Sequence, residues 1–209
     1  MRPIQFFKFG LGLLLCVSFT AAGAQETAPS ATWVHRLEFN IYLIEDDSHL
    51  LPIFRADRGK LHVEARYNYE EIDTFSGWVG YNFVGGDDLE YTVTPMAGGV
   101  LGSTNGIAAG LELTFDYRGF DLYSESEYMF DLEDKENDFY YTWTDFSYAP
   151  RDWLWFGISV QVTLMYQSDV EVECGLLVGG SYRRFDIAGY VFNLGSDDTY
   201  GILTLALNF

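Results

Sequence analysis

The chain has 209 residues, 48% of them hydrophobic and 18% aromatic, which is enough for one folded domain and too aromatic for a disordered tail. Its 12 lysines and arginines stand against 31 aspartates and glutamates, and such an acidic chain repels phosphate backbones, so we expect no nucleic acid among its partners. The mean hydropathy is close to zero, which argues against a bundle of membrane-spanning helices and leaves a membrane protein made of strands open.

The first 24 residues have the pattern of an export signal peptide. Arg2 and Lys8 precede an apolar run over 9–19, and Ala22 and Ala24 are the small residues that a signal peptidase requires. The run is too short for a stable transmembrane helix. Lipoprotein processing at Cys16 is the alternative, which the bulky leucine before that cysteine disfavours. We therefore expect a cleaved signal peptide over 1–24, a short linker over 25–33 and a folded domain over 34–209.

After the linker, apolar residues recur at every second position, which is the period of a β-strand. Over 61–70 the two faces are Leu61, Val63, Ala65, Tyr67 and Tyr69 against His62, Glu64, Arg66, Asn68 and Glu70. The segments 107–117 and 154–166 separate in the same way. The pattern predicts twelve strands, at 34–44, 50–56, 60–71, 75–85, 89–101, 106–117, 120–131, 139–149, 153–166, 170–183, 185–193 and 200–209.

The start of the domain leaves the strand number open between twelve and ten. The segment 50–56 is short and contains Pro52, which lacks the N–H that a central strand donates. Residues 34–58 could instead form a plug or a periplasmic arm, which would leave ten strands.

Most of the predicted segments are longer than the strands of a soluble sandwich, whose usual length is about five or six residues. About nine to eleven tilted residues cross a bilayer, and strands do so only in a closed barrel, because lipid offers no partner to an unpaired edge amide. We therefore predict an all-β fold, a closed antiparallel transmembrane β-barrel with lipid outside and a wet lumen inside. A soluble secreted β-protein is the alternative.

The C-terminal segment carries a resemblance to a known class. Over 199–209 the sequence is Thr-Tyr-Gly-Ile-Leu-Thr-Leu-Ala-Leu-Asn-Phe, which places Leu203, Leu205, Leu207 and the terminal Phe209 on one face. The chain resembles the outer-membrane β-barrels of Gram-negative bacteria, in which such a strand is the signal read by the barrel-assembly machinery. The resemblance implies a location in the cell outer membrane, in contact with its lipid and lipopolysaccharide, and both termini in the periplasm.

With both termini in the periplasm, the connections alternate between periplasmic turns and external loops. Those assigned to the outside are mostly acidic, namely 45–47, 70–73, 131–138 and 195–198. Those assigned to the periplasm, 55–60, 118–119, 151–152 and 183–184, hold seven of the ten basic residues that remain after signal cleavage (12 minus Arg2 and Lys8). The connection 85–88 breaks the pattern.

The polar faces of the strands predict the lining of the lumen. The expected lining residues are His62, Glu64, Arg66, Glu112, Asp116, Glu125, Glu127, Asp145, Glu171 and Glu173, with Arg36, Glu38, Asn40 and Gln161 beside them. One hypothesis is a narrow passive channel whose acidic lumen prefers small cationic solutes. The other is a closed structural or adhesive barrel in which Arg66 and its neighbours pair with the carboxylates across the lumen.

An enzyme is the third class, and the sequence gives it little support. His62 and Glu64 lie two residues apart on one face, but no serine at the spacing of the barrel lipases and no Asp-His pair accompanies them, so we expect no catalytic residues. The acidic stretch 131–138 lacks the mid-loop glycine and the spacing of a calcium hand. We expect neither a cofactor nor a metal site.

Overall fold

The computed structural model describes residues 32–45 and 48–209. The predicted signal peptide over 1–24 lies outside the described residues, and so does the predicted linker over 25–33 except for its last two residues. Asp46 and Asp47 of the first predicted external loop also lie outside them.

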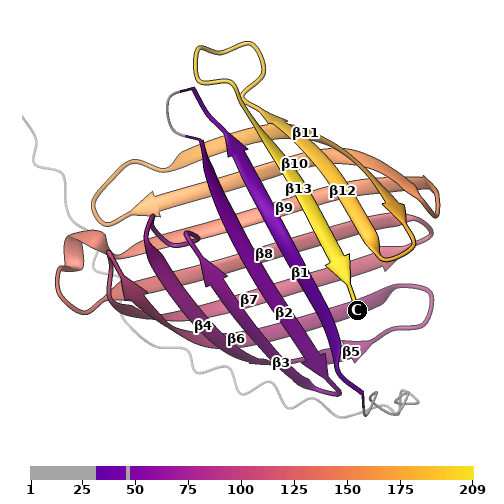
Figure 1. Cartoon of the computed structure of the whole chain (residues 1–209), viewed down its shortest axis with the longest axis horizontal. Helices are drawn as coiled ribbons and strands as arrows, with labels where there is room; N and C mark the ends of the chain where they lie inside the picture. Colours follow the sequence, from indigo (N-terminus) through magenta and orange to yellow (C-terminus); the bar gives the residue numbers. More distant parts are fainter. Residues whose placement is uncertain (1–31, 46–47) are drawn as a thin grey trace, which may run out of the picture.

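The strands form one antiparallel sheet that closes on itself (Figure 1). They are β1 (Val34–Leu43), β2 (His49–Arg58), β3 (Leu61–Tyr67), β4 (Thr74–Tyr81), β5 (Phe83–Gly85), β6 (Glu90–Gly102), β7 (Gly106–Tyr117), β8 (Phe120–Asp131), β9 (Phe139–Arg151), β10 (Leu154–Met165), β11 (Glu171–Tyr182), β12 (Phe185–Phe192) and β13 (Tyr200–Asn208). Because β5 continues β4 beyond Asn82 and both pair with β6, twelve strands pass around the barrel. The predicted fold class and strand number are confirmed.

The first and last strands form the seam of the barrel. β13 pairs with β1 over the register from Arg36–Asn208 to Leu43–Gly201. Beyond the ladder, the backbones of His35 and Phe209 exchange hydrogen bonds of 2.8 and 2.9 Å. The ring of the terminal Phe209 stacks on His35 at 5.2 Å between centroids. The seam therefore leaves neither terminal strand with a free edge.

The alternative with ten strands is wrong, since residues 34–58 build two strands of the barrel wall. Pro52 is accommodated within β2, where it lies opposite Phe39 of β1. The register of β2 with β3 begins only at Ile53, so Pro52 lies beyond that ladder. On the other side of Pro52 from that ladder, the side-chain amide of Asn68 donates to the carbonyl of Leu50 at 3.0 Å.

The outer surface of the barrel is apolar over its middle. Ile107, Ile158 and Leu176 expose 56%, 50% and 56% of their surface on three different strands. Ala108 follows Ile107 and Ser159 follows Ile158, and both of these next residues are buried inside the barrel. No helix among the described residues is long and apolar enough to cross a membrane. The one helix that they contain is a short 3-10 turn, η1 (Lys135–Asn137).

One wall of the interior is filled by apolar side chains. The cluster consists of Trp78, Met96, Val100, Ala108 and Met129, from β4, β6, β7 and β8. Gly98 makes room for it, since a Cβ atom at that position would stand 2.5 Å from the Trp78 ring. The polar interior borders this cluster, since the guanidinium carbon of Arg66 lies 4.7 Å from the Trp78 ring.

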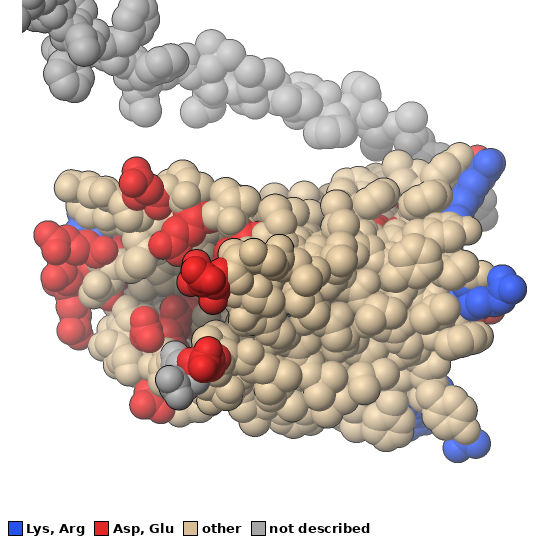
Figure 2. All heavy atoms as spheres, turned by 90° about the horizontal axis from the view of Figure 1, so that it is seen from above, with Lys and Arg blue, Asp and Glu red and all other residues tan. Residues whose placement is uncertain are grey.

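The two ends of the barrel differ in charge (Figure 2). The acidic end consists of the connections after β1, β3, β6, β8, β10 and β12 together with the strand residues next to them. The basic end consists of the connections after β2, β5, β7, β9 and β11 together with the strand residues next to them. In Figure 2 acidic side chains gather around a hollow at one end, and lysines and arginines project from the other. Exposed members are Glu71, Glu133, Asp134, Asp169 and Asp197 at the acidic end, and Arg58, Arg118, Arg151, Arg183 and Arg184 at the basic end.

The pair Gly98 and Gly99 tests the packing inside the barrel. Gly98→Ala should lower the free energy of unfolding by about 1–3 kcal/mol, because the new methyl group must displace Trp78. Gly99→Ala should change it little, since a Cβ atom there meets nothing within 4 Å. Denaturant unfolding in lipid vesicles, followed by far-UV circular dichroism, measures both. Equal effects of the two substitutions would contradict the close contact of Trp78 with β6.

Candidate functional site

The structure brings most of the predicted lining residues together inside the barrel. The buried ones are His62, Glu64, Arg66, Glu112, Glu125 and Glu127. Asp145 and Glu173 are half-buried, whereas Asp116 and Glu171 are exposed near the basic and the acidic end, respectively. The alternation of the strands places the buried set on one inner surface, so residues far apart in the sequence share one network.

Arg66 is the most enclosed cation of this network. Its side chain has no exposed surface, and its guanidinium lies 2.6 Å from a carboxylate oxygen of Glu64 and 3.1 Å from one of Glu127. A third ion pair joins it to Glu125. Since Glu125 and Glu127 belong to β8 and Arg66 to β3, these contacts cross the lumen. The rings of Tyr69 and Trp78 stand 4.4 and 4.7 Å from the guanidinium carbon.

Arg55 is a second internal cation. It falls both in the predicted strand 50–56 and in the predicted periplasmic connection 55–60, and the second assignment is wrong. β2 continues to Arg58, so Arg55 lies within the strand. Its guanidinium is 2.7 Å from Glu64 and 3.2 Å from Glu125. The preceding inward residues of β2, Leu51 and Ile53, are apolar and buried, so the inner face of this strand changes from apolar to charged at Arg55. Arg55 therefore lies on the same inner face of β2 as the apolar residues Leu51 and Ile53.

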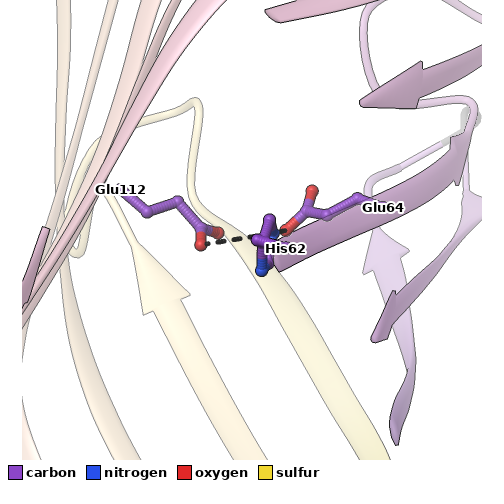
Figure 3. Close-up of side chains that lie close together, drawn as sticks. All are labelled: His62, Glu64 and Glu112. Carbon is purple, nitrogen blue, oxygen red and sulfur yellow. Dashed lines mark hydrogen bonds and ion pairs between the residues drawn. The ribbon is translucent and has the colours of Figure 1, made fainter. Parts of the chain in front are cut away.

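His62 lies between carboxylates of two opposite walls (Figure 3). Its Nδ1 atom is 2.9 Å from Asp57, and its Nε2 atom is 3.0 Å from Glu64 and 3.8 Å from Glu112. An imidazolium donating from both nitrogens satisfies these contacts. A general base needs a free lone pair that faces the substrate. Because both nitrogens of His62 face carboxylates, its ring offers none.

Ligand atoms of His62, Glu64 and Glu112 lie within 4.8 Å of one another, a spacing compatible with a metal ion. The same Glu64 oxygen that meets His62 also accepts a hydrogen bond from Arg55 at 2.7 Å. The cationic guanidinium and imidazolium thus already face this carboxylate. The cluster therefore fits an ion-pair network better than a metal site.

Carboxylates outnumber cations in this network. The ion pairs of the interior involve Arg36, Arg55, Arg66 and His62 on the cationic side. On the anionic side they involve Glu38, Glu64, Glu112, Glu125, Glu127, Asp57 and Asp186. Seven carboxylates thus share four basic side chains.

Two cavities lie inside the barrel, one above the other. The cavity toward the acidic end has a volume of about 510 Å³ and is lined by Glu70, Glu127 and residues of β8 to β10. The second, about 530 Å³, extends from the middle toward the basic end. Both are lined by Tyr42, Leu51 and Tyr69, so the two cavities meet at these three side chains.

Tyr69 and Glu70 reach this position because β3 is shorter than predicted. The predicted strand continued to residue 71, with Tyr69 facing lipid. β3 instead ends at Tyr67, and Asn68 adopts a positive φ of 57°. The connection 68–73 then turns inward, and the Tyr69 ring meets Tyr141 edge-on at 5.9 Å. Asparagine is one of the few residues that tolerate this conformation, which is the signal in the sequence that could have ended the strand.

No family model and no curated protein sequence matches this chain. Among solved structures, one described as KdgM porin has a TM-score of 0.61 and 10% sequence identity. Another, KdgM porin in complex with disordered oligogalacturonate, has a TM-score of 0.64 and 10% identity. Each match covers 83% of this chain and 99% of the porin. This chain has the fold of these porins.

Arg66 tests the ion-pair network. Arg66→Met should lower the free energy of unfolding by about 3–5 kcal/mol, because Glu64, Glu125 and Glu127 lose a shared cation. Denaturant unfolding in lipid vesicles measures this loss. Adding Glu127→Gln to Arg66→Met should restore part of it.

The matched control is Arg151→Met, at an exposed arginine of the basic end that donates to the Pro150 carbonyl. It should change stability by less than about 0.5 kcal/mol. A loss for Arg66→Met no larger than that of the control would contradict the network.

Proposed function

We propose that this protein is a narrow passive channel of the Gram-negative outer membrane whose lumen prefers cations. The observation that carries the proposal is the pair of cavities that meet inside a barrel whose ion pairs leave an excess of carboxylates. A negative lining attracts cations and repels anions along a narrow path. The apolar outer surface is of the kind that contacts lipid.

The proposed solutes differ from the one in the name of a similar structure. Oligogalacturonate, bound in one of the two KdgM structures, carries a carboxylate on every sugar. In this chain the surplus carboxylates of the lumen would repel such an anion. We infer that the two barrels share a fold and differ in the charge of the solutes that they admit.

The orientation follows from the same proposal. The acidic end would face outward, among lipopolysaccharide, and the basic end would face the periplasm together with the C-terminus. Leu203, Leu205 and Leu207 of β13 point to the outer surface, and Phe209 is exposed at the end of the seam. These side chains are therefore accessible to the barrel-assembly machinery. Removal of residues 1–24 by a signal peptidase is part of this proposal.

A closed structural barrel is the second candidate, and one observation favours it. Arg66 binds Glu125 and Glu127 across the lumen, and the connection 68–73 places Tyr69 where the two cavities meet. Such contacts narrow the path that a solute would take. The two candidates differ in one measurable property, ion conduction.

Planar-bilayer recordings of the purified protein separate the two candidates. Under a potassium chloride gradient we expect discrete openings and a reversal potential of the sign that indicates cation selectivity. Asp121 of β8 lines the second cavity, so Asp121→Asn should move the reversal potential toward zero. Asp152→Asn, the same change on an exposed turn of the basic end, should leave it nearly unchanged.

Silence at high protein load would contradict the channel and favour the closed barrel. Anion-selective openings would contradict the assigned role of the carboxylates.

A further inference from the structure

We propose that the cavity at the acidic end is a binding subsite for an organic cation, a primary ammonium group on an apolar body, with Glu70 and Glu127 as the acceptors of the ammonium. Both carboxylates line this cavity of about 510 Å³. Its role as the entry subsite of a permeation path rests on the proposed channel, whereas the binding itself does not.

Glu127 has a buried oxygen without a partner. The residue is 2% exposed, and one carboxylate oxygen, Oε2, pairs with Arg66 at 3.1 Å. The other oxygen, Oε1, is buried and has no hydrogen-bond partner among the described residues. A buried carboxylate oxygen without a donor is costly, so it is a strong acceptor for any donor that enters the cavity.

Glu70 presents a second carboxylate to the same cavity. Both of its oxygens are buried and lack a hydrogen-bond partner within the described part of the chain. Burial raises the pKa of the Glu70 carboxyl. The Arg66 charge acts in the opposite direction, so withdrawal from water is the larger effect.

The connection that carries Glu70 is held in place before any ligand arrives. The side chain of Asn68 accepts a hydrogen bond from the Asp73 amide at 2.9 Å and donates to the Leu50 carbonyl at 3.0 Å. The Tyr67 hydroxyl donates to Asp73 at 3.0 Å. Because these contacts fix both ends of the connection, Glu70 is aimed inward by the fold, and binding need not order a loose loop.

The nearest arginine, Arg66, already forms ion pairs with three other carboxylates. Arg66 is shared by Glu64, Glu125 and Glu127, and none of the ion pairs of the described residues involves Glu70. A further positive charge in the cavity would therefore find acceptors that no side chain supplies with a donor. This is the complementarity that an ammonium group requires.

The rest of the cavity wall suits an organic cation better than a bare metal ion. The remaining lining is aromatic or apolar at Tyr42, Leu51, Tyr69, Phe139, Tyr141, Met129 and Met165, and polar at Glu71, Ser103, Thr104, Asn137 and Thr163. Aromatic faces attract organic ammonium groups, and the volume lies in the range of about 300–1,000 Å³ usual for small-molecule sites.

Isothermal titration calorimetry of the protein in detergent micelles tests the site, with phenethylammonium as the probe. We expect saturable binding to the wild type and none of comparable affinity for 2-phenylethanol, which has a similar body without the charge. Glu127→Gln and Glu70→Gln should each weaken binding by about tenfold or more, the usual scale for loss of a charge-assisted hydrogen bond. Glu136→Gln, at an exposed glutamate of the connection after β8, is the matched control and should leave affinity unchanged.

Three results would overturn the proposal. Absence of binding to the wild type would mean that Glu70 and Glu127 are balanced by a proton alone. Equal affinity for 2-phenylethanol would assign the cavity to apolar ligands, and competition by calcium at similar concentration would assign it to a metal ion. Thermal unfolding of each variant by circular dichroism, with retained strand content, excludes misfolding as the cause of lost binding.

The outcome is separable from that of the channel test. Binding by a protein that is silent in planar bilayers would refute the channel and leave the subsite standing. Conduction without binding of phenethylammonium would refute the subsite and leave the channel standing.

Discussion

The constraint on which the rest of this structure depends is that every backbone amide in the membrane must find its partner within the sheet. The pairing of β13 with β1, extended past the ladder by His35 and Phe209, satisfies it at the one place where an edge would otherwise remain. The interruption at Asn82 is repaired as well, because its amide donates to the Lys60 carbonyl. Closure of the sheet therefore satisfies the backbone, and it also determines which side chains face lipid and which face the interior.

Once the sheet is closed, each residue faces either lipid or the interior, and the interior is too small to leave charges in bulk water. Arg55 and Arg66 link strands across the interior, since each forms ion pairs with carboxylates of more than one strand. Such pairs add little net stability compared with apolar packing, but a carboxylate left without its cation would be costly. The network thus narrows the lumen and fixes the positions of the carboxylates that remain in excess.

Periodicity in the sequence was sufficient to predict the barrel, its twelve strands and most of the inward carboxylates, because lipid outside and polar side chains inside impose alternation on each strand. It failed where the interior is apolar or where a strand stops. Leu51 and Ile53 face inward although they are apolar, so the pattern alone does not assign Arg55 to the inner face. Tyr69 kept the alternation although Asn68 had already turned the chain. Which carboxylate pairs with which cation depends on the closure of the barrel, and no local pattern contains it.

The same argument separates the structural carboxylates from those available for function. Glu64 faces His62, Arg55 and Arg66, so its charge is fully used in holding β3 to the strands around it. Glu70 lies only six residues later, but the reversal at Asn68 places it on a connection, where neither of its oxygens has a hydrogen-bond partner among the described residues. Because β3 is short and the connection after it turns inward, Glu70 becomes a carboxylate without a hydrogen-bond donor, unlike Glu64 on the strand itself. The end of β3, rather than the composition of the lumen, decides where a cation from outside would find a partner.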